Sequence, residues 1–393
     1  MKLGQLTFAL AFITTGCTST TSGTTSSITT TSSATATSST TTTAASNPTS
    51  ITFAFTGDVL SHTPLIDQAK RTAIANSTTE IQLDYDFRPM FLDIKPLVSG
   101  VDIAVCHLET PIAPDGEELS TYPFFGVPKE ITTAIADAGF DRCSTASNHA
   151  YDRGNDGIDA TVNALLTTGV EQSGMARTPE EIEPRIFTVR GIKLCHLSYT
   201  FSYNGLTMPD ETKWRSAIIN TQRILRDAKR ARELGSQATI VSMHWGTEKE
   251  SAANSMQTSI ADELTASGLV DLIVGHHAHV VQPTKQVNGI WVMYGLGNVL
   301  SNLPTDERWP INSQDAVIAT TSLTISSSGK AVFEKPVMHP TWVDKTHGWV
   351  IRDVQKSLQS ITTSQGLARE LELSLGRTTQ VLGDFISPYQ SLP

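Results

Sequence analysis

Short apolar runs alternate with longer amphipathic segments from Thr52 onward. The apolar runs are rich in β-branched residues, which is typical of buried strands; they read ITFAFTGDVL, VDIAVCHLE, GFDRCSTAS, IKLCHLSYT, ATIVSMHWG, VDLIVGHH and GIWVMYGLGN. The segments between them have a helical pattern and end in glycine, a common helix terminator; they span residues 127–139, 157–169, 220–235 and 255–268. This order predicts an α/β protein whose strands are largely buried.

The pattern changes near residue 315, where strand-like runs follow one another without helices between them. These runs read AVIATTSLTIS and KAVFEKPVMH, and residues 364–384 then have a helical pattern. We expect the late strands to form a mixed second sheet, which gives a four-layer αββα sandwich of two mixed sheets.

The first 50 residues have the composition of an export signal followed by a linker. One lysine precedes a short apolar run (residues 6–13), which is too short to span a bilayer as a helix. Cys17 follows Thr-Thr-Gly and resembles the cysteine of a bacterial lipobox; a plain signal peptide cleaved nearby is the alternative. Residues 18–50 are almost entirely Ser and Thr and have little to bury. We expect a signal peptide over residues 1–16 and a disordered stalk over 17–50, with Cys17 lipidated at the outer face of a bacterial membrane.

The charge of the chain limits its partners. Its 393 residues carry a formal net charge of −10, whereas a nucleic-acid partner requires a basic surface. We therefore expect no nucleic-acid binding. An acidic substrate would need a local source of positive charge, and a bound metal ion supplies one.

Four cysteines occur in the sequence. With Cys17 assigned to the lipid anchor, Cys106, Cys143 and Cys195 remain, and all three lie in or near apolar, strand-like runs. We expect three buried, unpaired cysteines rather than a disulfide framework.

Five polar clusters directly follow predicted strands. They are TGDVLSH with Asp58, CHLET with Glu109, SNHAYD with Asn148, His149 and Asp152, MHWGTE with His244, and GHHAH with His276, His277 and His279. Each alone has an ordinary explanation, such as a helix cap or a hydrogen-bonded interior histidine. Together they predict a site, because sites in such sheets form beyond the carboxyl ends of the strands. Oxygen and imidazole donors favour Mn, Fe or Zn in a reactive site over structural zinc, which favours cysteine.

Side-chain alternation separates the ligand candidates within two of these clusters. If GHHAH is extended, His277 and His279 lie on one side and His276 on the other, where it packs or supports the site. The same alternation places His107 and Glu109 on one face. Glu109 is the better ligand candidate, and His107 either orients a neighbour or packs.

A series of these motifs resembles a known family. GDVLSH, HLET, SNHAYDRG, MHWGTE, GHHAHVVQP and YGLGN resemble the motifs of the CapA-type poly-γ-glutamate (capsule) synthesis proteins, within the calcineurin-like metallophosphoesterase superfamily. The resemblance covers roughly residues 51–305 and implies an αββα sandwich with a two-metal site at one end. We expect such a domain over residues 51–340 and a C-terminal extension that packs on it over 341–393.

The resemblance also implies a role for each matching residue. The implied ligands of two divalent ions are Asp58, Glu109, Asn148, His244, His277 and His279. His149 would stabilise or protonate the leaving oxygen, and Asp152 would orient His149.

Three features depart from the family pattern. The superfamily has a histidine two residues after the first aspartate, where this chain has Leu60; His62 lies nearby at a different spacing and is a substitute candidate. The bridging aspartate of the superfamily is replaced by Glu109. The stretch TYPFFGVPKE lacks the basic residues expected there, apart from Lys129.

Three functions remain open from the sequence. The first is a metal-dependent hydrolase or transferase that acts in the biosynthesis of poly-γ-glutamate or a related capsule or envelope polymer. The second is a non-catalytic, membrane-tethered accessory protein that binds an acidic polymer or supports a membrane synthase complex. The third is a secreted metallophosphoesterase with a phosphoester substrate. Leu60 favours the accessory role, and the histidine cluster favours the enzyme.

Overall fold

The computed structural model describes residues 50–78, 82–304, 306–360 and 362–388. The expected signal peptide, Cys17 and the expected stalk up to residue 49 lie outside these ranges, so they stay predictions. No helix within the described ranges is both long and apolar enough to cross a lipid bilayer.

The first sheet is built from strands at the two ends of the described chain. Its strands are β1 (Ser50–Val59), β2 (Ile103–Leu108), β3 (Arg142–Ser144), β4 (Glu171–Ser173), β11 (Asp315–Ile325), β12 (Ala331–Phe333), β13 (Val337–Asp344) and β14 (Val350–Asp353). Their order is β14-β13-β11-β1-β2-β3-β4, with β12 beside β11. Strands β1 to β4 are parallel, whereas β11, β13 and β14 pair antiparallel. The expectation that the late strands form the second sheet is therefore wrong: β11 pairs with β1 and makes the first sheet mixed.

The second sheet comes from the middle of the chain. Its strands are β5 (Ile186–Val189), β6 (Ile192–Thr200), β7 (Ala238–His244), β8 (Leu272–His276), β9 (Thr284–Val287) and β10 (Ile290–Met293). They are ordered β5-β6-β7-β8-β10-β9. The four central strands are parallel and the two edge strands are antiparallel to their neighbours, so this sheet is mixed as well.

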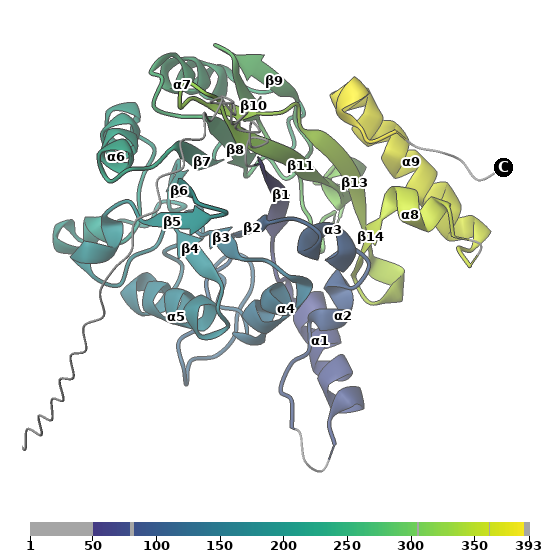
Figure 1. Ribbon diagram of the computed structural model, residues 1–393. Coiled ribbons are helices and arrows are strands. Elements are labelled where there is room, and N and C mark those ends of the chain that lie inside the picture. Colours follow the sequence, from purple (N-terminus) through teal and green to yellow (C-terminus); the bar gives the residue numbers. More distant parts are fainter. Residues whose placement is uncertain (1–49, 79–81, 305, 361, 389–393) are drawn as a thin grey trace, which may run out of the picture. The chain divides into compact units, whose positions relative to one another are not determined.

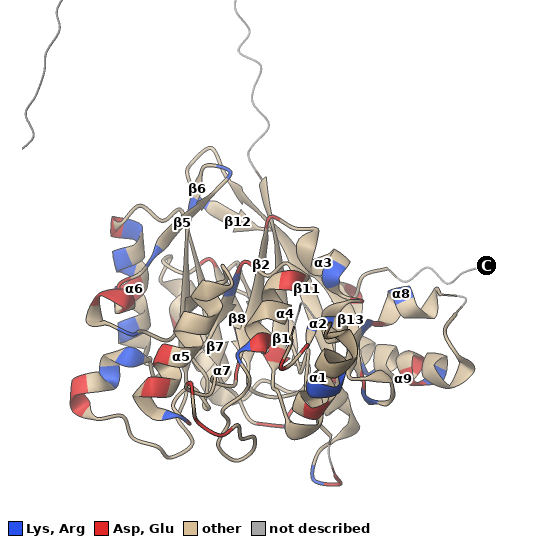
Figure 2. Ribbon diagram, turned by 90° about the horizontal axis from the view of Figure 1, so that it is seen from below, with Lys and Arg blue, Asp and Glu red and all other residues tan. Residues whose placement is uncertain are grey.

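Helices cover the outer face of each sheet. The described α-helices are α1 (Thr63–Asn76), α2 (Arg88–Phe91), α3 (Lys95–Ser99), α4 (Glu130–Ala138), α5 (Gly154–Thr167), α6 (Thr221–Glu233), α7 (Ser255–Ala266), α8 (Val354–Leu358) and α9 (Gln365–Leu382). Short 3₁₀ segments are η1 (Pro179–Ile182), η2 (Asp210–Arg215), η3 (Ile311–Gln314), η4 (Lys345–His347) and η5 (Gly383–Phe385). Figure 1 shows α4 and α5 beside the first sheet and α6 and α7 beside the second. Lys, Arg, Asp and Glu residues lie along α6 (Figure 2), as expected for a helix with one solvated face.

Three apolar clusters define the four layers. One packs the first helices against the first sheet, and includes Leu65 and Ile131. A second lies between the sheets, where Phe53 of β1 and Ile240 of β7 are both buried. A third packs α6 and α7 against the second sheet, and includes Ile224. The fold is the αββα sandwich of two mixed sheets that the sequence predicts.

The C-terminal region continues the first sheet. The expected domain limit at residue 340 falls within β13, and the expected helical tail is present as α9. Arg377 of α9 donates from Nε (2.6 Å) and Nη2 (2.7 Å) to the buried carboxylate of Asp315 on β11. This bidentate pair holds α9 on the sheet.

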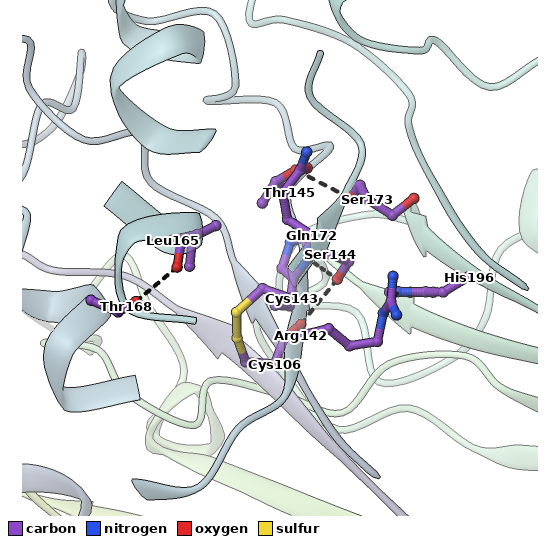
Figure 3. The surroundings of a disulfide bond; sticks show 11 residues. Cys106, Arg142, Cys143, Ser144, Thr145, Leu165, Thr168, Gln172, Ser173 and His196 are labelled. Atoms are coloured by element: carbon purple, nitrogen blue, oxygen red, sulfur yellow. Dashed lines mark hydrogen bonds between the residues drawn. A yellow bond between two sulfur atoms is a disulfide. The ribbon is translucent and has the colours of Figure 1, made fainter. Parts of the chain in front are cut away.

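Two of the three core cysteines are paired, which corrects the sequence expectation. Cys106 and Cys143 lie opposite each other on the adjacent strands β2 and β3, with Cα atoms 4.4 Å apart, and form a disulfide (Figure 3). Cys195 is buried and free, as expected. The pairing depends on strand register, which cysteine spacing alone does not specify.

Candidate metal centre

Asp58 lies near the end of β1 and is almost completely buried. Its Oδ1 lies 3.2 Å from Nδ1 of His276, and its Oδ2 lies 3.3 Å from Nδ1 of His279. The backbone N–H of His277 donates to the same Oδ2 at 3.2 Å. Burial alone would raise the pKa of Asp58, but the nearby imidazole nitrogens of His276 and His279 outweigh burial and lower it. The carboxylate therefore stays ionised in the interior.

The histidine cluster follows β8 in a turn rather than in an extended segment. His276 is the last residue of β8, whereas His277 has φ 89° and His279 has φ 57°. Positive φ values are uncommon for residues other than glycine. The predicted alternation is therefore wrong: His276 contacts Asp58 directly instead of lying on the opposite side.

Glu109 is a second buried carboxylate at the same edge, one residue beyond β2. Its Oε1 lies 3.6 Å from Nε2 of His279 and 4.0 Å from Nε2 of His244. Neither Oε atom has a hydrogen-bond partner within the described chain. Burial raises the pKa of Glu109 well above its usual range. A buried carboxylate without hydrogen bonds fits a cation that is held between it and the histidines.

A chain of imidazoles runs through the interior beside these carboxylates. Nε2 of His107 lies 2.9 Å from Nδ1 of His244, and Nε2 of His244 lies 2.9 Å from Oδ1 of Asn148. Nδ1 of His107 is also 2.8 Å from Oγ of Ser144. Burial, together with neighbouring histidines, lowers the pKa of His107 and His244 well below the usual range. Both are therefore neutral, the form in which imidazole binds a metal. Of the two roles left open for His107, the contact fits the orienting one.

Four groups of side chains have donor atoms close enough together to hold a metal ion. They are Asp58 with His107 and His276, Glu109 with His244 and His277, Glu248 with His277 and His279, and Asp58 with Glu109 and His279. Nδ1 of His277 and Oδ1 of Asp58 are further buried atoms without a hydrogen-bond partner within the described chain. The donor set and the unpartnered atoms are compatible with a metal site of imidazole and carboxylate ligands.

The fold thus brings together five of the predicted ligands, which lie up to 221 positions apart: Asp58, Glu109, His244, His277 and His279. Asn148 contacts this set through His244. Sequence reasoning did not name His107, His276 or Glu248 as ligand candidates. The HLE and HWGTE motifs carried a signal for two of them, because they place His107 and Glu248 close to predicted ligands. The individual ligand roles stay predictions.

His62, the substitute candidate for the missing histidine, lies apart from these groups. Its Nδ1 accepts the backbone N–H of Asn302 at 3.3 Å. Burial, together with the charge of His279, lowers the pKa of His62 to about 4. It belongs to none of the four donor groups found in the described chain.

His149 and Asp152 form the pair that the sequence predicts. Nδ1 of His149 lies 2.7 Å from Oδ2 of Asp152, which also accepts the backbone N–H of Phe125 at 2.7 Å. The edge of the Phe125 ring packs against His149, with centroids 4.7 Å apart. The Asp152 carboxylate accepts the Nδ1 proton of His149 and fixes the orientation of the ring. Nε2 of His149 is therefore the ring nitrogen that stays available to a substrate.

A cavity of about 570 Å³ lies beside these residues. Its lining includes Glu248 and His279 of the donor groups together with Asn148 and His149. It also includes four aromatic residues, Tyr122, Phe124, Phe125 and Trp309, and two basic residues, Lys249 and Arg308. The stretch TYPFFGVPKE thus contributes aromatic rings to the cavity, whereas its lysine, Lys129, pairs with Asp115 outside the lining. The basic residues come from two other segments, which sequence reasoning did not connect to the site.

A bacterial family matches the part of the chain that builds this site. The family described as "Bacterial capsule synthesis protein PGA_cap" matches residues 52–303. The chain therefore belongs to this family.

Curated relatives carry names consistent with this family. The chain is 22% identical over 243 residues to "Capsule biosynthesis protein CapA" of Bacillus anthracis, covering 60% of this chain and 57% of the relative. It is 23% identical over 237 residues to "PGA biosynthesis protein CapA" of Bacillus subtilis, covering 58% and 60%. A "Probable polyglutamine synthesis accessory protein" of Mycobacterium tuberculosis is 24% identical over 216 residues, covering 52% and 57%. The chain thus spans less than two thirds of the length of these relatives.

Solved structures with a distant likeness include phosphoesterases. A phosphatase of Mycoplasma pneumoniae has a TM-score of 0.45 and 12% identity, covering 75% of this chain and 95% of that chain. The calcineurin-like phosphoesterase YfkN of Bacillus subtilis has a TM-score of 0.42 and 11% identity, covering 85% and 99%. Likeness at this level carries no argument about substrate.

Proposed function

We propose that the protein is a metal-dependent hydrolase or transferase that acts in the biosynthesis of poly-γ-glutamate or a related acidic envelope polymer. The observation that carries the proposal is the buried pair of carboxylates, Asp58 and Glu109, which share His279 and belong to overlapping donor groups. A purely structural core would leave Glu109 with two unpartnered oxygens, at a cost in stability.

Divalent ions such as Mn, Fe or Zn, held by the predicted ligands, would activate water and polarise the scissile bond. The protein's own residues act around this chemistry. His107 orients His244 through Nδ1 of His244, which leaves Nε2 of His244, beside Oδ1 of Asn148, as the nitrogen that would bind a metal. Asp152 orients His149, so that Nε2 of His149 can deliver a proton to the leaving group at the cavity.

An acidic polymer is the substrate class that we propose for the cavity. Lys249 supplies positive charge at its lining, although the whole chain carries a formal net charge of −10. Arg308, the second basic residue of the lining, is paired with Asp306. The ring of Trp309 packs edge-on against His279 (5.5 Å between centroids), and Nζ of Lys249 lies 4.7 Å from the Trp309 centroid. The Trp309 ring thus contacts both Lys249 and His279.

We also propose that the protein acts at the outer face of a bacterial membrane, anchored through Cys17 and working with a membrane synthase complex. The export-like first residues and the Ser/Thr-rich segment support this location. The Cys106–Cys143 disulfide supports it as well, because disulfides persist in oxidising compartments.

The second candidate is a non-catalytic accessory protein with the same polymer as ligand. Leu60 favours it, because this buried residue stands where the superfamily has a ligand histidine, and His62 is outside the donor groups of the described chain. In the accessory role, the donor groups would bind a metal, but the protein would not convert the polymer.

Metal content measured by plasma mass spectrometry tests the proposal. The parent protein is compared with its His277→Ala/His279→Ala variant after growth with Mn, Fe or Zn. We expect about two equivalents of metal in the parent, as for a two-metal hydrolase, and their loss in the variant. His347→Ala is a matched control, because His347 is exposed and bound to Asp344 away from the cluster.

The outcomes separate the candidates. Two equivalents together with release of fragments from poly-γ-glutamate support the enzyme. A single equivalent without turnover supports the accessory protein. A folded parent that holds no metal after supplementation contradicts the enzyme.

A further inference from the structure

A buried arginine without an acidic partner lies at the edge of the sandwich, away from the cavity beside the metal centre. Arg142 is the first residue of β3 and is 5% exposed. Its Nε donates to Nδ1 of His196 at 3.3 Å, and its guanidinium lies 4.0 Å from the Phe187 ring centroid. Figure 3 shows the side chain extending from β3 toward His196.

No carboxylate in the described chain forms an ion pair with Arg142. The neighbouring Asp141 accepts the backbone N–H of Ala104 instead, at 2.7 Å. Burial lowers the pKa of Arg142 to about 10, so the group remains cationic at neutral pH. Its side chain donates from Nε to His196, and its two Nη groups have no hydrogen-bond partner within the described residues. The N–H donors of both Nη groups are therefore free to bind a ligand.

Arg142 lines a cavity of about 70 Å³ between the edges of the two sheets. This volume holds several water molecules or one small oxyanion. Gln172 and Ser198 are among its other polar lining residues, and the cavity shares no lining residue with the one at the metal centre. Nε of Arg215, which also lines it, is buried and has no hydrogen-bond partner within the described chain.

The acidic residues of this lining already have basic partners. Glu181 binds Arg177 and Arg185, and Glu183 accepts from Nε of Arg230 at 3.1 Å. Asp227 accepts the Tyr199 hydroxyl at 3.0 Å and lies 3.6 Å from Nε of Arg223. None of them forms an ion pair with Arg142. Glu171 and Asp141, which do not line the cavity, act on Arg142 through their charge without forming an ion pair with it.

We infer that this cavity is a binding site for a small oxyanion, a carboxylate or a phosphate group, held by the Arg142 guanidinium. A planar guanidinium with two free Nη groups matches two oxygens of such a group. His196 accepts from Nε and donates from Nε2 to Oγ of Ser242, 2.9 Å away, which fixes the plane of the fork. The site does not depend on the proposed catalytic function.

Anomalous diffraction from crystals soaked in sodium selenate locates the anion directly. We expect an anomalous peak within hydrogen-bond distance of the Nη atoms of Arg142. Isothermal titration with phosphate and, separately, with glutarate then measures affinity in solution and distinguishes the two sources of the oxyanion. The Arg142→Gln variant should lose about tenfold or more in affinity for the preferred anion, because it loses a charged hydrogen-bond partner.

Arg190→Gln is the matched control, since Arg190 is largely exposed, pairs with Asp102 and does not line the cavity. It should keep the affinity of the parent. If Arg142→Gln does not fold, Arg142→Lys retains the charge without the fork and should still weaken binding. A selenate-soaked parent crystal with no peak at Arg142, or equal anion affinities in the parent and a folded Arg142 variant, overturns the inference.

Discussion

Two glycines allow the backbone approach on which the metal centre depends. Gly57 precedes Asp58, and Gly275 precedes His276. A Cβ on Gly57 would lie 2.0 Å from the carbonyl oxygen of Gly297, and one on Gly275 would lie 1.9 Å from that of Tyr294. The same loop carries Asn298, whose Oδ1 lies 2.9 Å from Nδ1 of His279. The backbone before Asp58 and the backbone before His276 thus both pack directly against this loop.

Gly57→Ala should destabilise the protein by about 1–3 kcal/mol, the usual cost of overpacking, and should weaken metal binding because Asp58 moves with the backbone. Denaturant unfolding and metal content measure the two effects. Gly366→Ala is the control: nothing lies within 4 Å of a Cβ there, and alanine in a helix is favourable by up to about 1 kcal/mol. Equal stabilities for Gly57→Ala and the parent would contradict the close packing.

Lys345 gives the stability a defined pH dependence. Burial lowers its pKa to about 8 from a usual 10.5, while its Nζ donates to the backbone oxygens of Asn302 and Pro304. Between these two pH values the unfolded chain binds more protons than the folded chain, so the Lys345 contribution to the free energy of unfolding rises with pH.

Lys345→Met should reduce this rise, measured as the difference between parent and variant in urea unfolding from pH 7.5 to 10.5, a range set by the two pKa values. Lys70→Met, at an exposed position on α1, should keep the slope of the parent. Parallel curves for the parent and Lys345→Met would show that Lys345 does not titrate in this range.

At the scale of elements, α9 is held on the first sheet by a charged contact across a long sequence separation. Asp315 begins β11 and is buried, and Arg377 reaches it from the fourth turn of α9. Burial raises the pKa of Asp315 even though Arg377 lowers it. Removing the arginine would therefore leave a buried carboxylate without its counter-ion.

Arg377→Met should lower the free energy of unfolding by about 3–5 kcal/mol, the range for breaking a buried ion pair. The double variant Asp315→Asn/Arg377→Met should lose less, because no uncompensated charge remains. A double-mutant cycle from urea unfolding at neutral pH measures both. Additive effects of the two substitutions would argue against coupling between α9 and β11.

At the scale of the whole molecule, the candidate metal centre lies where strands of both sheets end together. Asp58 and Glu109 come from β1 and the residue after β2, whereas His244 and His276 end β7 and β8. A site at the meeting edge of two sheets requires both halves of the fold. A fragment that contained only one sheet would carry only part of the donor set.

The predicted lipid anchor also belongs to this scale. Cys17→Ser should move the protein from the membrane fraction to the soluble fraction of the cell envelope, because an acylated cysteine is the proposed attachment. Immunoblotting of the fractions and mass spectrometry of the N-terminal peptide measure the change. Cys195→Ser serves as the control, since this cysteine is buried in the fold. Equal membrane retention of Cys17→Ser and the parent would contradict the anchor.

Local sequence information was sufficient for the alternation of strands and helices and for the polar clusters. The four-layer arrangement was predicted correctly, although the late strands were assigned to the wrong sheet. Hydrophobic periodicity reflects burial, and a strand such as β1, buried on both faces, reads as an apolar run whatever its partners. The polar clusters that contain Asp58, Glu109 and His244 could be found because each follows such a run. The C-terminal helix could be recognised for the same reason.

Tertiary structure alone decided which segments become neighbours. The assignment of β11 to the first sheet and the pairing of Cys106 with Cys143 depend on strand order and register, which apolar patterning does not encode. The contact of His276 with Asp58 joins β8 of one sheet to β1 of the other. The buried position of Arg142 without an ion-pair partner within the described residues is also a product of packing, because it exists only once both sheets are in place.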